Sequence, residues 1–341
     1  MRFTRSACTL IASAAVVLGA AAAGAQEHTL RIQTHHSAES TVGEAAAQFF
    51  DDVETMSGGR IVFEPFYSSS VVKSVETFDA VLNGILDADL TAGSYQTGKD
   101  TAFQFVGDPM GGYDTPWQLY AFVYVGGGLE EARELYASFG MHLVGFHIAA
   151  SESLASTRPL AGVADLQGFK FRSPPGMETM IFAKLGASPI VMDFTEVFTA
   201  LEAGLIEGAD MANLDVNRSA GLHDVAKHAT YPGFHSTPAN HFAIRQDVWD
   251  AMSEDLQRIV EVGHQKFAFR LTLTGSVATE EAARQLEAEG VTLHDWSVED
   301  RAAYRKAALA SWDEFADSDA ARELVQMHKD FIEVIGLAGA E

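Results

Sequence analysis

Apolar and polar positions alternate along the chain in two different periods, one typical of strands and one typical of helices. Residues 29–34 alternate with period two and lead through a polar turn into a segment with Phe49 and Val53 on one helical face. Residues 61–66 predict a second strand and residues 75–86 a second helix. This repeated order predicts an α/β fold, in which polar residues at strand ends face a ligand crevice.

The clearest pair of strand-to-helix units lies in the middle of the chain. In residues 169–172 the basic Lys170 and Arg172 alternate with two phenylalanines, so they face the opposite side of the expected strand. Ser173 is then expected to cap a helix. A second strand and helix follow, and the chain reaches Asp210 through another short strand. The pattern therefore predicts Arg172 and Asp210 at comparable ends of neighbouring strands.

The same stretch carries a family resemblance in the order and spacing of its motifs, which occupy residues 165–172, 185–187, 196–204 and 207–210. These motifs resemble those of the DctP-type extracytoplasmic solute receptors of tripartite ATP-independent periplasmic (TRAP) transporters. The resemblance extends more loosely over almost all of the chain after residue 26. Residues 107–128 resemble the branch of that family that binds 2-oxoacids and related monocarboxylates.

The resemblance implies a two-lobed periplasmic binding protein with a ligand cleft between the lobes. It implies one lobe from residues 26–149 with 239–275, and a second lobe from residues 150–238 with 276–341. Between Ser253 and about residue 290 the chain has no proline and few glycines. This segment predicts one C-terminal helix of ~55 Å at 1.5 Å per residue, long enough to span both lobes.

The N-terminal residues predict export. Arg2 and Arg5 precede an apolar run from Leu10 to Ala23, and small residues of the kind found at cleavage sites follow. We therefore expect a cleaved signal peptide at residues 1–25 and a periplasmic mature protein. Cys8 lies within the signal peptide, so the mature fold cannot depend on disulfides.

The acidic composition makes a cationic ligand contact important. The sequence has 23 Lys and Arg against 47 Asp and Glu, a formal net charge of −24, which excludes nucleic acid as a favoured partner. A small acid needs a local positive site in such a protein, and Arg172 can hold a carboxylate through two parallel hydrogen bonds. Two alternatives remain open: Arg172 pairs internally with a carboxylate, or Arg158, Arg218 or Arg245 is the ligand arginine.

Two further candidate ligand residues follow from the residue pattern. His36 lies in the polar turn after the first strand, where it either faces the pocket or belongs to a capping loop. Tyr95 lies in a glycine-rich loop that differs from a P-loop because Asp100 follows the lysine, where a phosphate-binding loop needs Ser or Thr. Tyr95 therefore either lines the pocket rim or packs internally.

The resemblance adds four more candidates. It places Glu152 at a ligand-contacting position just beyond a strand, where relatives carry arginine or an uncharged polar residue. Met211 replaces an expected tryptophan beside Asp210. Phe234 and His235 belong to an aromatic return loop that is expected to wall the ligand.

Two acids, Glu152 and Asp210, are thus expected beside Arg172 in a site meant for an anion. Either a cation such as calcium bridges them to the ligand, or Arg172 neutralises one while the other accepts hydrogen bonds from ligand hydroxyls. Ser236 stands where the branch often has a metal-binding glutamate, and hard cations need six to eight oxygens. We therefore favour a site with no metal and no cofactor.

The sequence favours a receptor over an enzyme or an adhesive protein. It has no G-x-S-x-G elbow and no zinc signature. The resemblance implies a TRAP receptor that binds a small organic acid (a 2-oxo or hydroxy monocarboxylate, or an aromatic carboxylate) and delivers it to the membrane permease. In the 2-oxoacid branch the C-terminal helices can join two subunits, so a homodimer is a further expectation.

Overall fold

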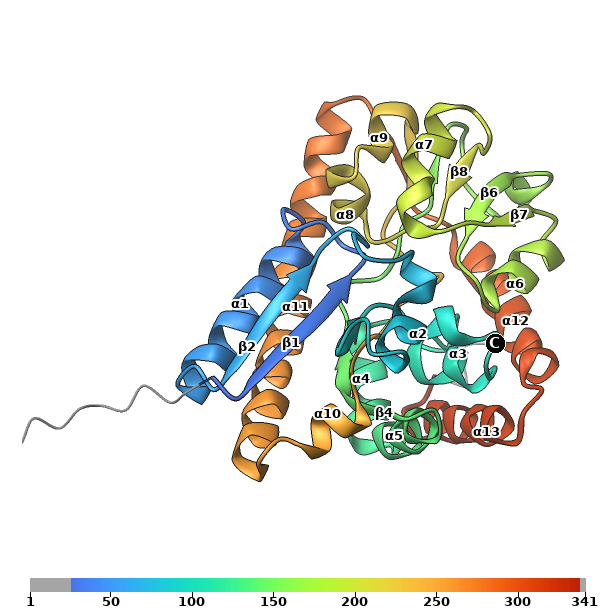
Figure 1. Cartoon of the computed structure of the whole chain (residues 1–341). Helices are drawn as coiled ribbons and strands as arrows, with labels where there is room; N and C mark the ends of the chain where they lie inside the picture. Colours follow the sequence, from blue (N-terminus) through green and yellow to red (C-terminus); the bar gives the residue numbers. More distant parts are fainter. Residues whose placement is uncertain (1–25, 338–341) are drawn as a thin grey trace, which may run out of the picture.

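The computed structural model describes residues 26–337. The expected signal peptide and Cys8 lie outside these residues. The described chain forms two β-sheets with helices packed around them, and the two sheets belong to two lobes, as the α/β pattern and the resemblance predicted. In Figure 1 the lobe with β6, β7 and β8 lies above the lobe with β1 and β2.

The first sheet has five strands in the order β2-β1-β3-β10-β4. Its strands are β1 (His28–Thr34), β2 (Ile61–Phe66), β3 (Ala88–Leu90), β4 (Met141–His147) and β10 (Asn240–Arg245). β1 is parallel to β2 and β3, whereas β10 is antiparallel to both β3 and β4. A late segment of the chain therefore returns to the middle of a sheet made by early segments.

The second sheet has six short strands in the order β11-β9-β5-β8-β6-β7. Its strands are β5 (Ala155–Ser156), β6 (Lys170–Ser173), β7 (Ser188–Val191), β8 (Gly208–Ala209), β9 (His228–Thr230) and β11 (Thr292–His294). β6 pairs in parallel with β7 and β8. Since Arg172 is in β6 and Asp210 follows β8, both lie at the same edge of this sheet, as the sequence predicted.

The predicted helices are present, although some of their ends are shifted, and the structure adds helices that the sequence did not predict. The helices are α1 (Thr41–Ser57), α2 (Thr77–Leu82), α3 (Ala102–Gly107), α4 (Pro116–Val125), α5 (Gly128–Ser138), α6 (Glu178–Lys184), α7 (Val197–Glu202), α8 (Leu214–Ser219), α9 (Leu222–Val225), α10 (Gln246–Asp250), α11 (Glu254–Ala288), α12 (Val298–Phe315) and α13 (Asp319–Val334). The additional ones include α3, α4, α8, α9 and α10. Phe49, Phe63, Phe242 and Phe267 form the aromatic centre of the core between the first sheet, α1 and α11. Within residues 26–337, none of the helices has the length and apolarity needed to cross a membrane.

The long C-terminal helix is confirmed as α11, which has 35 residues. It packs on α1 and β4 at the first sheet, and on α8 and β11 at the second. Gly275 brings it against the segment that leads from one sheet to the other, because a Cβ there would lie 2.4 Å from the carbonyl oxygen of Ala149. α13 packs on α3 and α5, beside the first sheet. The exact lobe boundaries remain a proposal.

The expected helix cap at Ser173 is wrong. Ser173 is the last residue of β6, and its hydroxyl donates to Glu178 Oε2 at 3.0 Å instead of capping a backbone amide. The helix α6 begins after Met177, whose side chain makes no cap hydrogen bond. The proline pair that suggested a cap instead belongs to the bend between strand and helix.

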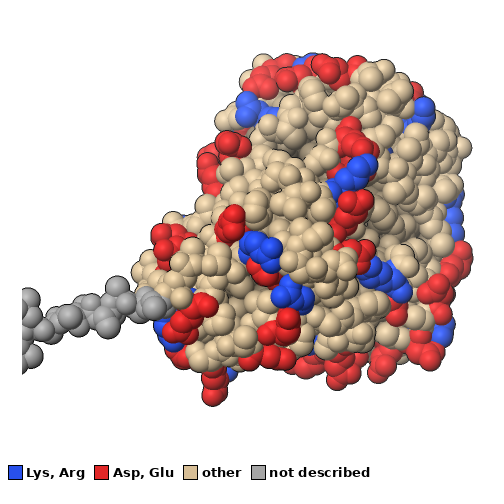
Figure 2. Space-filling view, viewed as in Figure 1, with Lys and Arg blue, Asp and Glu red and all other residues tan. Residues whose placement is uncertain are grey.

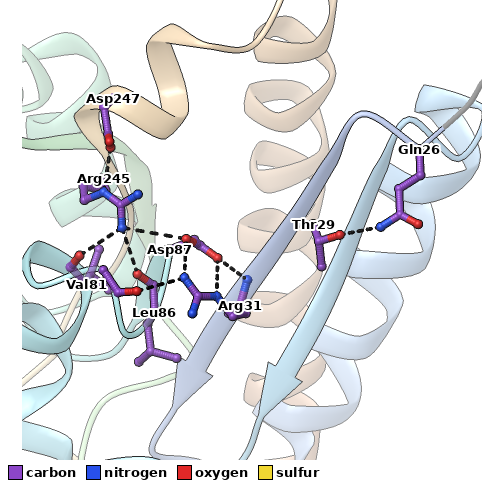
Figure 3. A network of polar contacts seen from close by, with 9 residues as sticks. Gln26, Thr29, Arg31, Val81, Leu86, Asp87, Arg245 and Asp247 are labelled. Carbon is purple, nitrogen blue, oxygen red and sulfur yellow. Dashed lines mark hydrogen bonds and ion pairs between the residues drawn. The ribbon is translucent and has the colours of Figure 1, made fainter.

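A network of charged groups fastens the first sheet well away from its ligand-facing edge (Figure 3). Asp87 accepts from Arg31 Nε at 2.8 Å, and Arg245 Nη1 lies 3.7 Å from the other carboxylate oxygen. Burial raises the pKa of Asp87, but the hydrogen bonds from Arg31 outweigh it and leave that pKa below its usual value. The contacts of Arg245 therefore hold β10 beside the end of α2 and the start of β3.

Candidate functional site

A cavity lies between the two lobes and is lined by residues from both. Its lining includes six of the eight predicted site residues: Arg172, Glu152, Asp210, Met211, His36 and Tyr95. It also includes residues that the sequence did not single out, among them His35, Ser94, Asp108, Asn213 and Asn240. The cavity volume is about 50 Å³. A buried water needs ~10–15 Å³ measured in this way, so the cavity has room for only a few small groups.

Arg172 lies in the wall from the second sheet and is only 1% exposed. Its Nε donates to the carbonyl of Met192 at 3.0 Å, and its Nη1 donates to the carbonyl of Asp210 at 2.5 Å. Among the described residues, none accepts a hydrogen bond from Nη2. The guanidinium is therefore held in place by two backbone carbonyls while one of its nitrogens stays free. Internal pairing of Arg172 does occur, but with carbonyls and not with a carboxylate.

Asp210 is buried next to His235, whose Nε2 lies 3.1 Å from Asp210 Oδ1. Burial raises the pKa of Asp210, but the charge and hydrogen bond of His235, together with Arg172, outweigh this effect and lower the pKa. Asp210 is therefore the ionised carboxylate of the site. His235 does not line the cavity and supports Asp210 from behind.

Three more carboxyl groups crowd the same region. Burial, with Asp210 and Asp108 nearby, raises the pKa of Glu152 well above its usual value. Burial, with Asp210 and Glu152 nearby, does the same for Glu178. Burial raises the pKa of Asp108 to about 7, against a hydrogen bond from Ser236 at 2.8 Å. The raised pKa values favour the neutral forms of Glu152 and Glu178 and so reduce the negative charge of the site.

The wall from the first lobe includes three uncharged rings. His35 and His36 are buried with ring centroids 4.1 Å apart, and Tyr95 lies 5.8 Å from His35. Burial lowers the pKa of His36 to about 4 and the pKa of His35 well below its usual value. Burial raises the pKa of Tyr95. All three rings are therefore neutral at physiological pH.

The structure places Phe234 outside the cavity. Its ring packs 4.7 Å from Trp296, and the guanidinium of Arg301 lies 5.0 Å from its centroid. The expected wall of Phe234 and His235 therefore lies one layer behind the cavity lining. The sequence suggested this position through the family's aromatic loop, which gives the chain path but not the direction of the rings.

The alternative ligand arginines also lie outside the cavity. Arg218 pairs with Glu289 at 2.7 Å, and Arg158 donates to the carbonyls of Asp165 and Gln167. Arg245 pairs with Asp87 (Figure 3). On the face shown in Figure 2, basic side chains are interspersed with acidic ones. Of the four arginines considered, Arg172 alone combines a cavity position with a free nitrogen.

Several contacts join the two lobes across the cavity. Phe194, which follows β7, packs against His35 with centroids 4.7 Å apart. Its neighbour Asp193 accepts from Ser74 Oγ at 3.1 Å, and Glu196 pairs with Lys73 at 2.9 Å. The turn at residues 193–196 therefore bridges the two lobes and packs against His35, which lines the cavity.

Most of the sequence matches the model of one protein family. The family model described as bacterial extracellular solute-binding protein, family 7 (DctP), matches residues 32–319. The chain belongs to this family. A crystal structure of a TRAP periplasmic solute-binding protein from Rhodobacter sphaeroides, in an apo open form, is 33% identical, with 91% of this chain and 99% of that chain covered and a TM-score of 0.72.

Two other relatives extend the comparison. A monocarboxylate 2-oxoacid-binding periplasmic protein from a Nostoc strain is 26% identical over 82% of this chain and 77% of the relative. A TRAP solute-binding protein from Bordetella bronchiseptica, a dimer with calcium and picolinate in one site, has a TM-score of 0.85 at 22% identity, with 92% and 94% of the two chains covered. The present protein is thus a solute-binding protein of the TRAP type and not an enzyme.

The carboxylates of this solute-binding protein fit a calcium ion poorly. Oxygen or nitrogen atoms of Glu152, Asp210 and His235 lie within 4.8 Å of one another, which is close enough for a shared ion. However, one of the three is a histidine nitrogen, and calcium takes oxygen ligands. That nitrogen is also paired with Asp210 Oδ1, and the raised pKa of Glu152 disfavours the ionised carboxylate that calcium prefers. The geometry therefore supports no role for calcium.

Sequence reasoning missed three residues of the solute-binding protein that shape its site. Asp108 meets Ser236 from a position 128 residues away. Glu178 lies in the first turn of α6, where an acid is ordinary. His35 directly precedes His36 where the strand alternation ends, so both rings reach the cavity. The adjacent histidines were the one visible signal.

Proposed function

We propose that this protein is a receptor for a small organic monocarboxylate, which it binds through Arg172 and delivers to the membrane permease of a TRAP transporter. The observation that carries this proposal is the free Nη2 of a buried guanidinium whose other nitrogens are fixed. A ligand carboxylate that accepts from Nη2 gains a charge-assisted hydrogen bond in a site shielded from water. The rigid placement of Arg172 lowers the entropic cost of binding.

The protonation states remove the apparent conflict between an anionic ligand and the nearby acids. Asp210 is ionised but lies between His235 and Arg172. The raised pKa of Glu152 favours its neutral form, whose hydroxyl can donate to the ligand instead of repelling it. Arg172 therefore faces one compensated carboxylate, and a small monoanion can enter without a bridging metal.

The comparisons support the same ligand class. The Nostoc relative is named for monocarboxylate 2-oxoacids, and the Bordetella relative holds picolinate, an aromatic carboxylate. Each of these ligands has one carboxylate and is small. The small cavity in the present protein agrees with that class.

Closure of the two lobes around the ligand is the mechanism that we propose. The turn at residues 193–196 supplies Phe194 as an apolar contact and Asp193 as a polar one to the opposite lobe. These contacts can form only when the lobes are close. The permease would then recognise the closed form, in a periplasmic setting that follows from the expected signal peptide.

We also propose that a second copy of the chain covers part of α11. Phe269, Leu273 and Val277 lie four residues apart on one face of this helix and are 56%, 46% and 59% exposed. Trp117 of α4 lies beside them, 5.9 Å from the ring of Phe269. Light scattering should give the mass of a dimer at micromolar concentration, and a monomer mass would refute this interface.

Thermal shift against a library of carboxylic acids tests the proposed ligand class. An acid present at 100 times its dissociation constant should add about 2.7 kcal/mol to the free energy of unfolding. We expect at least one small monocarboxylate to raise the melting temperature, and its amide to have no effect. A library in which every monocarboxylate leaves the melting temperature unchanged would overturn the proposal.

A further inference from the structure

The histidine wall of the cavity has hydrogen-bonding capacity that the carboxylate contact does not use. No described residue makes a hydrogen bond with Nδ1 or Nε2 of His36, or with Nδ1 of His35. Both histidines line the cavity, and both are at most 5% exposed. Buried polar atoms in folded proteins are nearly always hydrogen-bonded. These three nitrogen atoms are therefore expected to have a hydrogen-bond partner.

The packing around His36 prevents its ring from finding that partner inside the protein. The ring lies against His35 at 4.1 Å and against Phe194 at 5.6 Å. Neither neighbour can pair both ring nitrogens, since Phe194 has no polar atom and no hydrogen bond joins the two histidines. Polar atoms for His36 must therefore come from what occupies the cavity.

The protonation state of His36 defines the group it would bind. Burial keeps its ring neutral, with a pKa of about 4. A neutral imidazole has one N–H donor and one acceptor nitrogen. A hydroxyl group both donates and accepts, whereas an oxo group only accepts. The unpaired acceptor nitrogen therefore distinguishes a hydroxyl from an oxo group on the ligand.

The size of the cavity limits the rest of the ligand. At about 50 Å³ it has room for a short acid but not for a long hydroxylated chain. Arg172 and His35 face the same cavity from opposite walls, and the positive charge of Arg172 contributes to the lowered pKa of His35. One wall thus suits a carboxylate and the other an uncharged polar group a short distance away.

We infer that His36, supported by His35, forms a hydroxyl-recognition subsite that makes this receptor select short hydroxy acids over the corresponding 2-oxoacids. This inference rests on the proposed function, because it takes Arg172 as the carboxylate anchor. The inference adds that the opposite wall recognises the hydroxyl group of the ligand. Lactate and pyruvate are the matching probes, since they share a carbon skeleton and differ only in the hydroxyl or oxo group.

Calorimetry with the full mature chain tests the inference without any mutation. We expect D-lactate, L-lactate or glycerate to bind at least tenfold more tightly than pyruvate. Pyruvate binding that equals or exceeds that of all three hydroxy acids would overturn the subsite, as would the failure of all four probes to bind. If all four fail while another carboxylate binds through Arg172, the proposed function stands and only the hydroxyl subsite falls.

Two variants locate the preference. His36→Phe keeps a ring between His35 and Phe194 but removes both nitrogens, so the ratio of pyruvate to lactate affinity should move to within about threefold of unity. His142→Phe is the matched control, because His142 also has an unpaired buried nitrogen and stacks on Trp249 at 3.9 Å, outside the cavity. A preference for lactate that survives in His36→Phe would refute the assignment. If that variant does not fold, the measured preference of the wild-type protein still decides.

Discussion

The two walls of the cavity solve different problems with different chemistry. The wall from the second sheet holds Arg172 among carboxyl groups, and its charges are balanced through Asp210 and His235. The wall from the first lobe presents the neutral rings of His35, His36 and Tyr95, and the nitrogens of His36 are unpaired. A charged group needs fixed compensation in a buried site, whereas a neutral group needs only geometry. Under the proposed function, one wall would anchor the ligand and the other would distinguish its substituents.

Replacing the anchor should have the largest effect. Arg172→Lys should weaken binding of the acid identified by the thermal-shift screen at least tenfold, about 1.4 kcal/mol. A lysine cannot hold the carbonyls of Met192 and Asp210 and still present a free nitrogen in the same plane. The melting temperature should also fall, because two buried carbonyls lose their donor. Calorimetry and thermal unfolding measure the two effects separately.

Arg158→Lys is the matched control for this anchor variant. Arg158 also donates to two backbone carbonyls, but outside the cavity. Its replacement should leave ligand affinity unchanged. Wild-type affinity in Arg172→Lys, or an equal loss of affinity in both variants, would remove Arg172 as the specific anchor.

Weakening the contact that brings the walls together should have the next largest effect. Ser74→Ala removes the donor to Asp193 across the lobes, while Asp193 keeps its hydrogen bonds from Thr195. The loss of one such bond costs ~1 kcal/mol, so affinity should fall about fivefold through a less favourable closure. Small-angle scattering of the ligand-free variant should show a larger mean radius.

Ser219→Ala controls for the loss of a serine hydroxyl alone. Ser219 donates to the carbonyl of Val216 within α8, so it does not join the lobes. We expect unchanged affinity in this control. A Ser74→Ala protein that binds as tightly as the wild type would show that the turn at residues 193–196 does not help closure.

Two buried groups that line the cavity should respond to pH in opposite directions. The pKa of Asp108 is raised to about 7, so the folded protein takes up a proton there and loses stability as pH rises from about 4 to about 7. The pKa of His36 is lowered to about 4, so its contribution is present above about pH 6.5 and is lost as pH falls to about 4. Between about pH 4 and pH 7 the two contributions to the stability of the ligand-free protein therefore oppose each other.

Thermal unfolding of Asp108→Asn between pH 5 and pH 8 checks this assignment. Without the ionisable group, Asp108→Asn should gain stability relative to the wild type as pH rises from 5 to about 7, by about 2 °C in melting temperature for a change of ~0.5–1 kcal/mol. The exposed Asp51 of α1 provides the control Asp51→Asn, for which no such change is expected. A melting temperature that depends on pH in Asp108→Asn just as it does in the wild type would contradict the pKa assignment.

Removal of divalent cations should have the smallest effect. His235 Nε2 already pairs with Asp210 Oδ1, so few carboxylate oxygens remain to bind calcium. Exhaustive chelation should change affinity for the screened acid by less than about twofold. Affinity that collapses on chelation and returns with calcium would show that the carboxylates bind an ion after all, and would replace the metal-free account.

The sequence was sufficient for those features that depend on local pattern. The period-two alternation in residues 169–172 and the short strand at Gly208 predicted that Arg172 and Asp210 lie at the same edge of a sheet. The absence of proline after Ser253 predicted the long helix α11. Features that depend on distant chain segments were not predictable. The pairing of Asp108 with Ser236 requires the complete fold, and the ring direction of Phe234 depends on Trp296. The helix cap at Ser173 was predicted wrongly because the two prolines that follow it are compatible with the start of a helix as well as with a bend.

The strand order of the first sheet has a consequence for the time course of folding. β4 pairs only with β10, and β10 also supplies the second neighbour of β3. Since β10 begins at Asn240, almost a hundred residues after β4 has been synthesised, β4 must wait without a partner while the chain of the second sheet is made. The two lobes therefore cannot fold independently, one after the other. Completion of the first depends on the later part of the chain, and such long-range pairing is expected to slow folding.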